Sequence, residues 1–234
     1  MSRDLIYGRR PVREALRGRR RALEVWASER ALDAEPWLRE APRLEVKQER
    51  ELSQAASTRD HQGVLAWAEP YRYADAWELA AQEQPVLVCL DQVSDPRNLG
   101  AVCRSAEGAG AAGVVIPAHG SAAVTPAVAK ASAGAVEHVP VAVVPNLARY
   151  LQEIKRDDLW IYGAAGDARQ TLWQADLTGG AVFVLGAEGC GLRPLVRRRC
   201  DELISIPLVG EVASLNVSAA AAVLLFEAKR QRSA

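Results

Sequence analysis

The sequence of 234 residues has no long apolar run and no net charge. A helix that spans a bilayer needs about 20 consecutive apolar residues, and no segment here approaches that length. The first residues, MSRDLIYGRR, do not lead into the apolar stretch of a signal peptide. We therefore expect a cytoplasmic protein that does not enter a membrane. A formal net charge of +0 excludes a global attraction to nucleic acid, so any basic surface must be local.

Cysteine, histidine and lysine are also scarce. The four cysteines show no CxxC pair and no zinc-ligand spacing, and none of the three histidines stands in a ligand cluster, so we expect no metal site. Two of the cysteines lie within apolar segments, as buried free thiols usually do. Of the 29 basic residues four are lysine (positions 47, 130, 155 and 229), which leaves 25 arginines. A GC-rich genome explains this excess as readily as a chemical role does.

From Pro85 onward, short apolar runs alternate with helical segments. Runs such as VLVCL and AVFVL lack polar alternation, which is typical of strands covered on both faces. We predict strands at 86–91, 113–116, 139–143, 160–163, 181–186 and 203–206. We predict helices at 99–109, 126–133, 147–156, 192–200 and from 217 onward. The predicted fold class is therefore α/β, with a mostly parallel sheet in a domain over residues 85–234.

A smaller α/β domain is expected to precede this region. In residues 1–70 we predict helices at 11–18 and around 36–40, and strands at 22–27, 44–46 and 63–66. The polar, Ala-rich residues 71–84 are typical of a linker with one helical turn. The first 21 residues hold eight arginines against only Asp4 and Glu14. Such a local excess favours binding of RNA phosphates, with a solvated helix face as the alternative.

Three segments of the large region share one plan, in which a strand ends in a polar, Gly-containing turn that opens a helix. They are DQVSDPRNLGAVCR (91–104), FVLGAEGCGLR (183–193) and LISIPLVGEVASLNVS (203–218). At one edge of a parallel sheet such turns bring main-chain groups together around a ligand. We expect Asn98 to be an N-cap and Gly100 to admit another backbone or a ligand. Taken alone, Asn98 is explained as a cap and Arg104 as a surface partner of Glu107.

The loop at 186–191 places three glycines around Glu188. It is neither a phosphate loop nor a GxGxxG fingerprint. A carboxylate here repels a pyrophosphate but attracts a cation or accepts hydrogen bonds from an amine. Taken alone, the loop is explained as a tight turn. Ser214 and Asn216, taken alone, are explained as capping residues of the last helix.

In this order and at these spacings, the three segments resemble the signature motifs of the SpoU (TrmH) family of RNA ribose 2′-O-methyltransferases. Tyr7-Gly8 and His61-Gln62-Gly63 resemble parts of the small RNA-binding domain that precedes the catalytic domain in part of this family. The resemblance implies a trefoil knot, S-adenosylmethionine as cofactor, and a homodimer with active sites at the subunit interface. It implies that the backbones of three residues hold the cofactor: Gly186, Ile206 and Leu215. It implies a catalytic set of Arg104, Asn98, Glu188, Ser214 and Asn216. For RNA contact we single out Arg9, Arg10, Arg13, Arg17 and His61.

Ala187, together with the DELISIP, SLNVS and FEA segments, looks most like the branch of this family that methylates a guanosine of 23S ribosomal RNA. The alternatives are a transfer-RNA ribose methyltransferase and a non-catalytic RNA-binding or ribosome-assembly protein of the same fold. A guanidinium stays protonated at neutral pH. We therefore expect Arg104 to stabilise the developing alkoxide or to position the neighbouring phosphate. A deprotonated Arg104 acting as general base is the competing hypothesis. Glu188 and Asn216 are expected to orient Arg104 and the loops.

Overall fold

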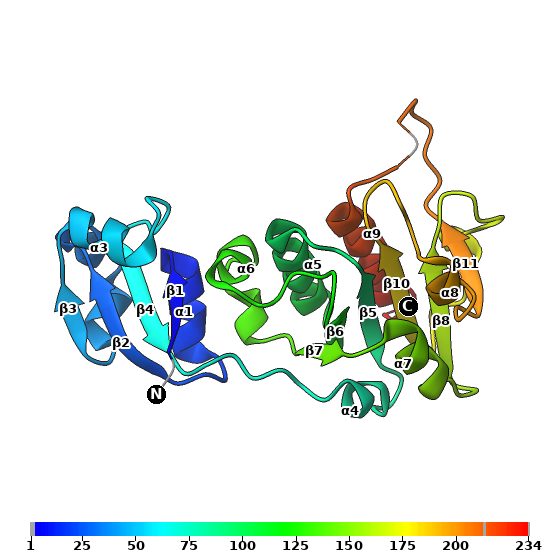
Figure 1. Ribbon diagram of the computed structural model, residues 1–234, viewed down its shortest axis with the longest axis horizontal. Coiled ribbons are helices and arrows are strands. Elements are labelled where there is room, and N and C mark those ends of the chain that lie inside the picture. The colour runs from blue at the N-terminus through cyan, green and yellow to red at the C-terminus, as the bar shows by residue number, and fades with distance from the viewer. Residues whose placement is uncertain (1–2, 213, 234) are drawn as a thin grey trace.

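The structure, a computed structural model, describes residues 3–212 and 214–233. Figure 1 shows two α/β units side by side, a small one that contains the N-terminus and a larger one that contains the C-terminus. Strands β1 to β4 form a four-stranded sheet in the small unit, and strands β5 to β11 form a seven-stranded sheet in the large unit. Each sheet therefore comes from one continuous part of the chain.

The small sheet has the order β1-β4-β2-β3, in which β2 and β3 are parallel and the other neighbours antiparallel. Its strands are β1 (Asp4–Tyr7), β2 (Ala22–Ala27), β3 (Leu44–Val46) and β4 (Val64–Ala68). Its helices are α1 (Arg9–Arg17), α2 (Glu29–Ala34), the 3₁₀ helix η1 (Pro36–Glu40) and α3 (Glu49–Ala56). The predicted strands at 22–27 and 44–46 are confirmed. The sequence prediction misses β1, α2 and α3, because each buries a single residue and so lacks an apolar period.

The large sheet has the order β7-β6-β5-β10-β8-β11-β9, and all its neighbours are parallel, which confirms the predicted fold class. Its strands are β5 (Val86–Asp91), β6 (Gly113–Pro117), β7 (Val141–Val144), β8 (Leu159–Ala164), β9 (Gln170–Thr171), β10 (Gly180–Gly186) and β11 (Glu202–Ser205). Its helices are α5 (Pro96–Ala109), α6 (Pro126–Ala131), η2 (Ala135–Glu137), α7 (Leu147–Glu153), η3 (Leu172–Gln174), α8 (Pro194–Arg197) and α9 (Val217–Arg232). The prediction gives β5 its observed bounds and misses the very short β9.

The segment 71–84 contains the expected helical turn as α4 (Ala76–Ala80). This segment is packed against the large sheet rather than free. Ala74 forms a parallel bridge with Ala142 of β7, and Leu79 is buried in the core on that side. The segment is therefore a structural part of the large unit.

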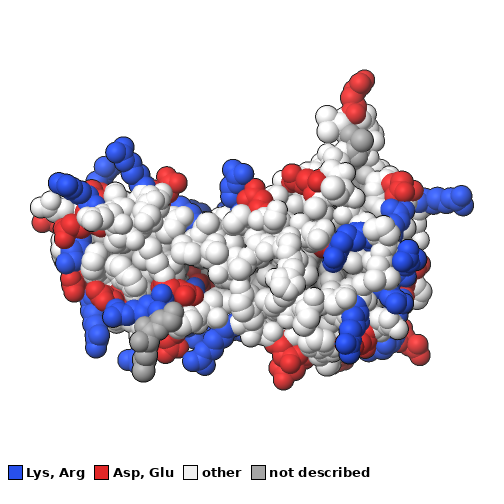
Figure 2. All heavy atoms as spheres, in the orientation of Figure 1, with Lys and Arg blue, Asp and Glu red and all other residues white. Residues whose placement is uncertain are grey.

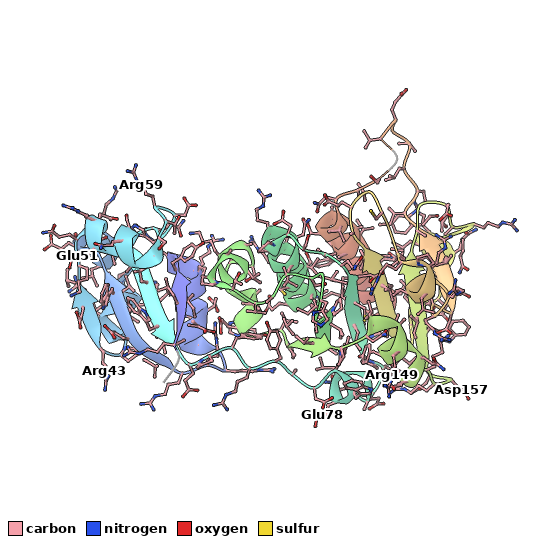
Figure 3. All side chains as sticks on the ribbon, viewed as in Figure 1. Arg43, Glu51, Arg59, Glu78, Arg149 and Asp157 are labelled. Atoms are coloured by element: carbon pink, nitrogen blue, oxygen red, sulfur yellow. The ribbon has the colours of Figure 1, made fainter. Side chains whose placement is uncertain are left out.

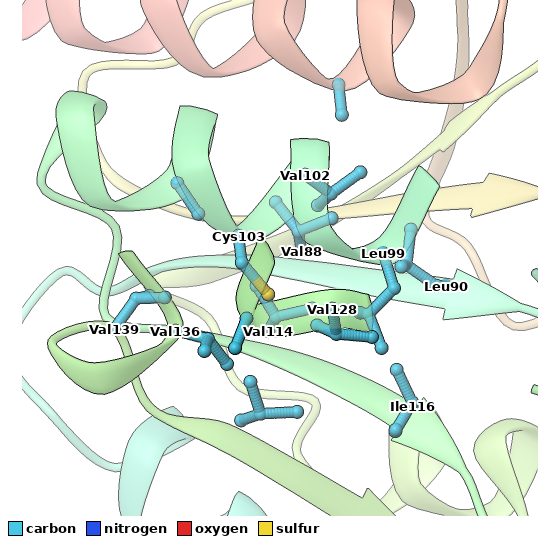
Figure 4. Close-up of a cluster of buried hydrophobic side chains, with 14 of the residues drawn as sticks. Val88, Leu90, Leu99, Val102, Cys103, Val114, Ile116, Val128, Val136 and Val139 are labelled. Carbon is cyan, nitrogen blue, oxygen red and sulfur yellow. The ribbon is translucent and has the colours of Figure 1, made fainter. Parts of the chain in front are cut away.

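The central strands of the large sheet are covered on both faces. On β5, Val88 faces a core formed with α5, α6 and α9, whereas Leu87 and Cys89 face a second core formed with α4 and α7. Figure 4 shows the first core, where Leu99 and Val102 of α5 lie over the sheet. Because successive strand residues point to opposite faces, a strand buried on both sides is apolar throughout. This explains why the run VLVCL identifies β5.

One hydrophobic cluster continues from the small unit into the large one. It includes Ile6, Val12 and Ala15 of the small unit together with Val128 and Val136 of the large unit. Helix α1 contacts both α6 and η2 across this boundary. The two units thus share a core.

On the face drawn in Figure 2, charged side chains of both signs are mixed. Figure 2 shows Lys and Arg interspersed with Asp and Glu at both ends of the molecule, and Figure 3 shows labelled examples such as Arg59 and Glu78 pointing outward. In the part of the chain that the structure describes, no helix is both long enough and apolar enough to cross a membrane.

Candidate functional site

The three Gly-containing turns meet at one edge of the large sheet, as predicted. Asn98 Nδ2 donates a hydrogen bond to Glu188 Oε1 (3.2 Å). Asn216 Nδ2 donates to Asn98 Oδ1 (3.0 Å) and to the same oxygen of Glu188 (2.5 Å). Each of these residues comes from a different turn, and Asn98 and Asn216 are 118 positions apart. We call these three residues the amide–carboxylate cluster.

Asn98 is not the N-cap of its helix, which corrects the prediction. Helix α5 begins at Pro96, and the side chain of Asp95 caps it by accepting the N–H of Arg97 (2.8 Å). A hydrogen bond from the Arg97 side chain lowers the pKa of Asp95 below its usual value, so the cap stays ionised. Since Asp95 satisfies the helix end, Asn98, the third residue of α5, has its side-chain amide free to reach Glu188 and Asn216.

Asn216 both caps a helix and joins the cluster. Its Oδ1 accepts the N–H of Ser218 (2.9 Å) at the start of α9, while its Nδ2 reaches the other two members. The capping bond fixes the side-chain rotamer, so the start of α9 orients the amide. Ser214 lies nearby and lines the adjoining pocket.

A pocket of about 320 Å³ opens beside the cluster. This volume is at the lower end of the range for small-molecule sites. All three residues predicted to hold a cofactor through their backbones line it: Gly186, Ile206 and Leu215. The end of β8 and the chain after it also contribute, through Ala164, Ala165 and Gly166, and the sequence prediction misses that segment.

Gly186 is required because the loop at 186–191, which we call the glycine loop, folds back over it. A Cβ added to Gly186 would lie 2.0 Å from the carbonyl carbon of Gly191 and 2.4 Å from Leu192 N. The fold-back depends on Gly189 (φ +78°) and Gly191 (φ +65°), and it is closed by a hydrogen bond from Gly191 N to Ala187 O (2.9 Å). The loop therefore forms a wall of exposed main-chain groups at the end of β10.

Gly100 admits another backbone rather than a ligand. A Cβ there would lie 2.5 Å from the Cβ of Ala131 and 2.8 Å from the carbonyl oxygen of Val128. Both neighbours belong to α6. Of the two possibilities that the sequence leaves open, the structure selects close packing of α5 on α6.

The sequence prediction also misses the ion pair of Asp91 and Arg193. Asp91, the last residue of β5, is fully buried and stands beside Gly186 in the sheet register. Its Oδ2 accepts the backbone N–H of Arg193 (2.8 Å), and its Oδ1 accepts the Arg193 Nε–H (2.7 Å). Arg193 lies two residues after Gly191, the last residue of the glycine loop, so this carboxylate anchors the chain where it leaves the loop. A carboxylate at the last position of an otherwise apolar strand was the available signal.

Arg104 does not reach the amide–carboxylate cluster within its own chain. It is exposed on α5, and its side chain makes no hydrogen bond or ion pair with any residue in 3–212 or 214–233, and that includes Glu107. Six residues of α-helix correspond to about 600°, which places Arg104 about 120° around the helix from Asn98. The structure therefore separates Arg104 from the other four members of the predicted catalytic set.

Of the residues predicted to contact RNA, three form a stripe on α1: Arg10, Arg13 and Arg17, which are all exposed. Arg9 is partly covered and donates through Nε to the carbonyl oxygen of Gln62 (3.2 Å).

The expectation that His61 touches RNA is wrong for this structure. The residue is 2% exposed, its Nδ1 accepts the N–H of Gly63 (3.0 Å), and its Nε2 bonds Ser53 Oγ (2.9 Å).

Two further properties concern metals and thiols. Among the described residues, no group of three or more His, Cys, Asp and Glu side chains has an arrangement that holds a metal ion. Cys89 and Cys103 are buried and Cys200 is partly buried, whereas Cys190 is exposed on the glycine loop beside the pocket.

Comparison with known proteins matches both units to described families. Residues 85–226 match the model of the SpoU rRNA Methylase family, and residues 5–74 match a model described as RNA 2′-O ribose methyltransferase substrate binding. The 23S rRNA (guanosine-2′-O-)-methyltransferase RlmB of Vibrio cholerae is 42% identical over 245 aligned positions, which cover 100% of this chain and 99% of that protein. Its counterpart in Escherichia coli K12 is 48% identical over 177 positions, covering 74% of this chain and 73% of the relative.

The solved structures include a similar whole-chain arrangement. The SpoU methyltransferase AviRb of Streptomyces viridochromogenes, in complex with the cofactor AdoMet, superposes with a TM-score of 0.82 and 25% identity. The superposition covers 99% of this chain and 91% of AviRb.

Proposed function

Because the chain belongs to the SpoU rRNA methylase family, we propose that it methylates the 2′-hydroxyl of a guanosine ribose in 23S ribosomal RNA, with S-adenosylmethionine as methyl donor. The observation that carries the proposal is the amide–carboxylate cluster at the rim of the pocket. The relatives that match along the whole chain are named for this reaction. We place the enzyme in the cytoplasm, where ribosomal RNA is available to it.

The pocket suits S-adenosylmethionine in size and chemistry. Its wall combines the main chain of the glycine loop with apolar side chains such as Leu208 and Leu215, and Glu188 supplies a carboxylate at the rim. When bound, S-adenosylmethionine supplies an electrophilic methyl group on a positively charged sulfur. We infer that Gly186, Ile206 and Leu215 hold the cofactor through their backbone N–H and C=O groups. Glu188 favours a positive charge nearby, which agrees with a cationic ligand.

The amide–carboxylate cluster is proposed to hold the loops rather than to transfer protons. Two amides and one carboxylate that bond each other keep three separate turns in register, and such positioning lowers the barrier to reaction. Ser214 lines the pocket, and we propose that its hydroxyl hydrogen-bonds an incoming ligand. This role requires the cluster to be intact before the substrate arrives.

Arg104 is proposed to stabilise charge on the ribose oxygen or to hold the adjacent phosphate. Its guanidinium remains protonated at neutral pH, so the ribose proton passes to phosphate or water. Since Arg104 does not reach the cluster of its own chain, we infer that a second copy brings it to a site shared between subunits.

A second copy is proposed to cover the outer face of α5 and α9. Phe226 is 49% exposed on α9 beside Gly108 of α5, and Lys229 Nζ donates to the Gly108 carbonyl oxygen (3.0 Å). Arg104 lies one helical turn before Gly108 and so shares this face. A dimer through this face buries Phe226 and brings two copies of Arg104 to the interface. Light scattering should show dimers for the wild type and monomers for Phe226→Glu, and a monomer with full methyl transfer would contradict the proposal.

The chain path agrees with the trefoil knot that the family likeness implies. The glycine loop folds over the end of β10, while the chain after β11, near the sheet edge, returns to α9, which packs on α5 and β10. We infer that this return passes through the loop. The small unit, residues 1–70, is proposed to bind RNA through Arg9 and the exposed stripe on α1.

The test is primer extension at low nucleotide concentration on RNA from a deletion strain. Complementation with the wild-type gene should restore one 2′-O-methyl stop in 23S rRNA, whereas Asn98→Ala should restore little. A stop that appears only in transfer RNA would favour the transfer-RNA alternative. Calorimetry that detects no S-adenosylmethionine binding would favour a non-catalytic RNA-binding protein.

A further inference from the structure

Arg20 stands in the arginine-rich N-terminal segment, yet its side chain points into the molecule. It follows α1 and is 8% exposed. Its Nε donates to Glu137 Oε2 (2.9 Å), its Nη2 donates to the other oxygen of that carboxylate, and its Nη1 donates to Asp4 Oδ2 (3.0 Å). The ring of Tyr71 lies 5.2 Å from the guanidinium carbon. With these partners Arg20 is not among the arginines that present charge to RNA.

Glu137 is the partner from the large unit, and its side chain is fully buried. Among residues 3–212 and 214–233, Arg20 is the one cation that pairs with it. Burial of a carboxylate is costly unless a hydrogen-bonded cation compensates for it. The cost of burying the Glu137 carboxylate is therefore compensated by a residue 117 positions away, in the other unit.

The surfaces around this ion pair fit closely. A Cβ on Gly18 would lie 2.8 Å from the Cβ of Glu137, and a Cβ on Gly134 would lie 2.6 Å from the Cβ of Glu14. His138 Nε2 and Glu14 Oε2 add a second polar contact at 2.9 Å. Two glycines, one on each side of the boundary, leave room where any side chain would collide. This packing favours one orientation of the two units.

Helix α1 connects this boundary to the RNA-binding stripe. Its buried residues, Pro11, Val12 and Ala15, face the protein, and its exposed arginines occupy the opposite side. The helix contacts α6 and η2, and η2 ends at Glu137. The orientation of α1 therefore sets the distance and direction from the stripe to the amide–carboxylate cluster.

We propose that the Arg20–Glu137 ion pair locks the small unit onto the large one and so positions the arginine stripe of α1 for the RNA that enters the site. The proposal rests on the proposed function, because its benefit is efficient methylation of RNA. Arg20 and Glu137 are positioning residues and touch neither cofactor nor ribose. An RNA that needs both units is bound in proportion to the fraction of molecules in which the units are docked.

The charge of Glu137 allows the test to distinguish an electrostatic effect on RNA binding from loss of the lock. Removal of a carboxylate strengthens general attraction to RNA, whereas loss of the lock weakens methylation, so the two effects have opposite signs. We would compare Glu137→Gln, Arg20→Met and the double variant. The matched controls are Glu40→Gln and Arg19→Met, which remove the same charges at exposed positions without partners in the described chain. Readouts are kcat/KM on a 23S rRNA fragment, S-adenosylmethionine affinity by calorimetry, and the radius of gyration by small-angle X-ray scattering.

For each single variant we expect kcat/KM to fall by about tenfold, as when the docked fraction drops to about one tenth. The radius of gyration should rise while cofactor affinity stays within about twofold. The kcat/KM of the double variant should be no lower than that of the less active single variant, because the two residues act as one unit. Unchanged or higher kcat/KM for Glu137→Gln, or additive losses with unchanged scattering, would overturn the lock. If the wild type methylates no 23S rRNA, the proposed function fails, while scattering still decides whether the pair holds the units together.

Discussion

Replacement of Gly186 by alanine should strongly weaken cofactor binding. The new Cβ would lie 2.0 Å from the carbonyl carbon of Gly191, whereas ordinary contacts begin at 3.4 Å. The glycine loop must therefore retreat by about 1.4 Å, the difference between these distances. Overpacking of this kind typically costs about 1–3 kcal/mol of folding stability. The retreat also moves the main-chain wall of the pocket, and loss of two or three main-chain hydrogen bonds of about 1 kcal/mol each weakens affinity about 100-fold.

The matched control is Gly179→Ala, since a Cβ there meets nothing within 4 Å. Gly179 directly precedes β10, the strand that ends at Gly186. Titration calorimetry with S-adenosylmethionine and thermal unfolding of both variants separate lost affinity from lost stability. If Gly186→Ala binds the cofactor as tightly as Gly179→Ala does, the glycine loop does not form the cofactor wall and the reasoning fails.

Substitutions at three other positions test the remaining parts of the site and the fold. Arg104→Ala should reduce the single-turnover methylation rate by roughly 10²–10³-fold with little change in cofactor affinity, and Arg104→Lys should rescue little; a near wild-type rate for Arg104→Ala would return Arg104 to a surface role. Asp91→Asn loosens the anchor at Arg193 and should weaken cofactor affinity by about tenfold, as measured by calorimetry. This loss corresponds to the lower end of the free energy that a charge-assisted hydrogen bond contributes, because the Arg193 guanidinium is partly exposed. Hydrogen bonds from Arg230 and Gln231 lower the pKa of Glu227 to about 2 from an ordinary 4.5, so its stabilisation is complete above pH 4.5 and is lost as the pH falls towards 2. Glu227→Gln should therefore show a smaller stability loss between pH 7 and pH 3 in urea unfolding than the wild type.

Strands of the large sheet were predictable because burial on both faces leaves an uninterrupted apolar run. The same rule fails for β9, which has two residues, and for β1, in which only Ile6 is buried. Convergence of the three Gly-containing turns was also predictable, since parallel strands end at a common edge. Which side chains contact one another at that edge depends on side-chain geometry, which the pattern of apolar runs and glycines does not contain.

The position of Asn98 shows how a local rule can select the wrong residue. Asp95 and Asn98 are both good caps, but Pro96 belongs at the first position of a helix, which favours Asp95. Arg20 shows a different limit. Nothing in its neighbourhood distinguishes it from the exposed arginines around it, because its partner, Glu137, is 117 positions away. Long-range pairs of this kind require the fold to be known.

The surroundings of the four thiols make this protein suitable for selective chemical labelling. Burial raises the pKa of Cys103 and of Cys200 to about 12, and it raises the pKa of Cys89 as well. A thiol reacts with maleimides as its thiolate, so these three are protected in the folded protein. Cys190 is exposed and sits on the loop that walls the pocket. A fluorophore attached there would report occupancy of the pocket in real time, in the native sequence and without engineering.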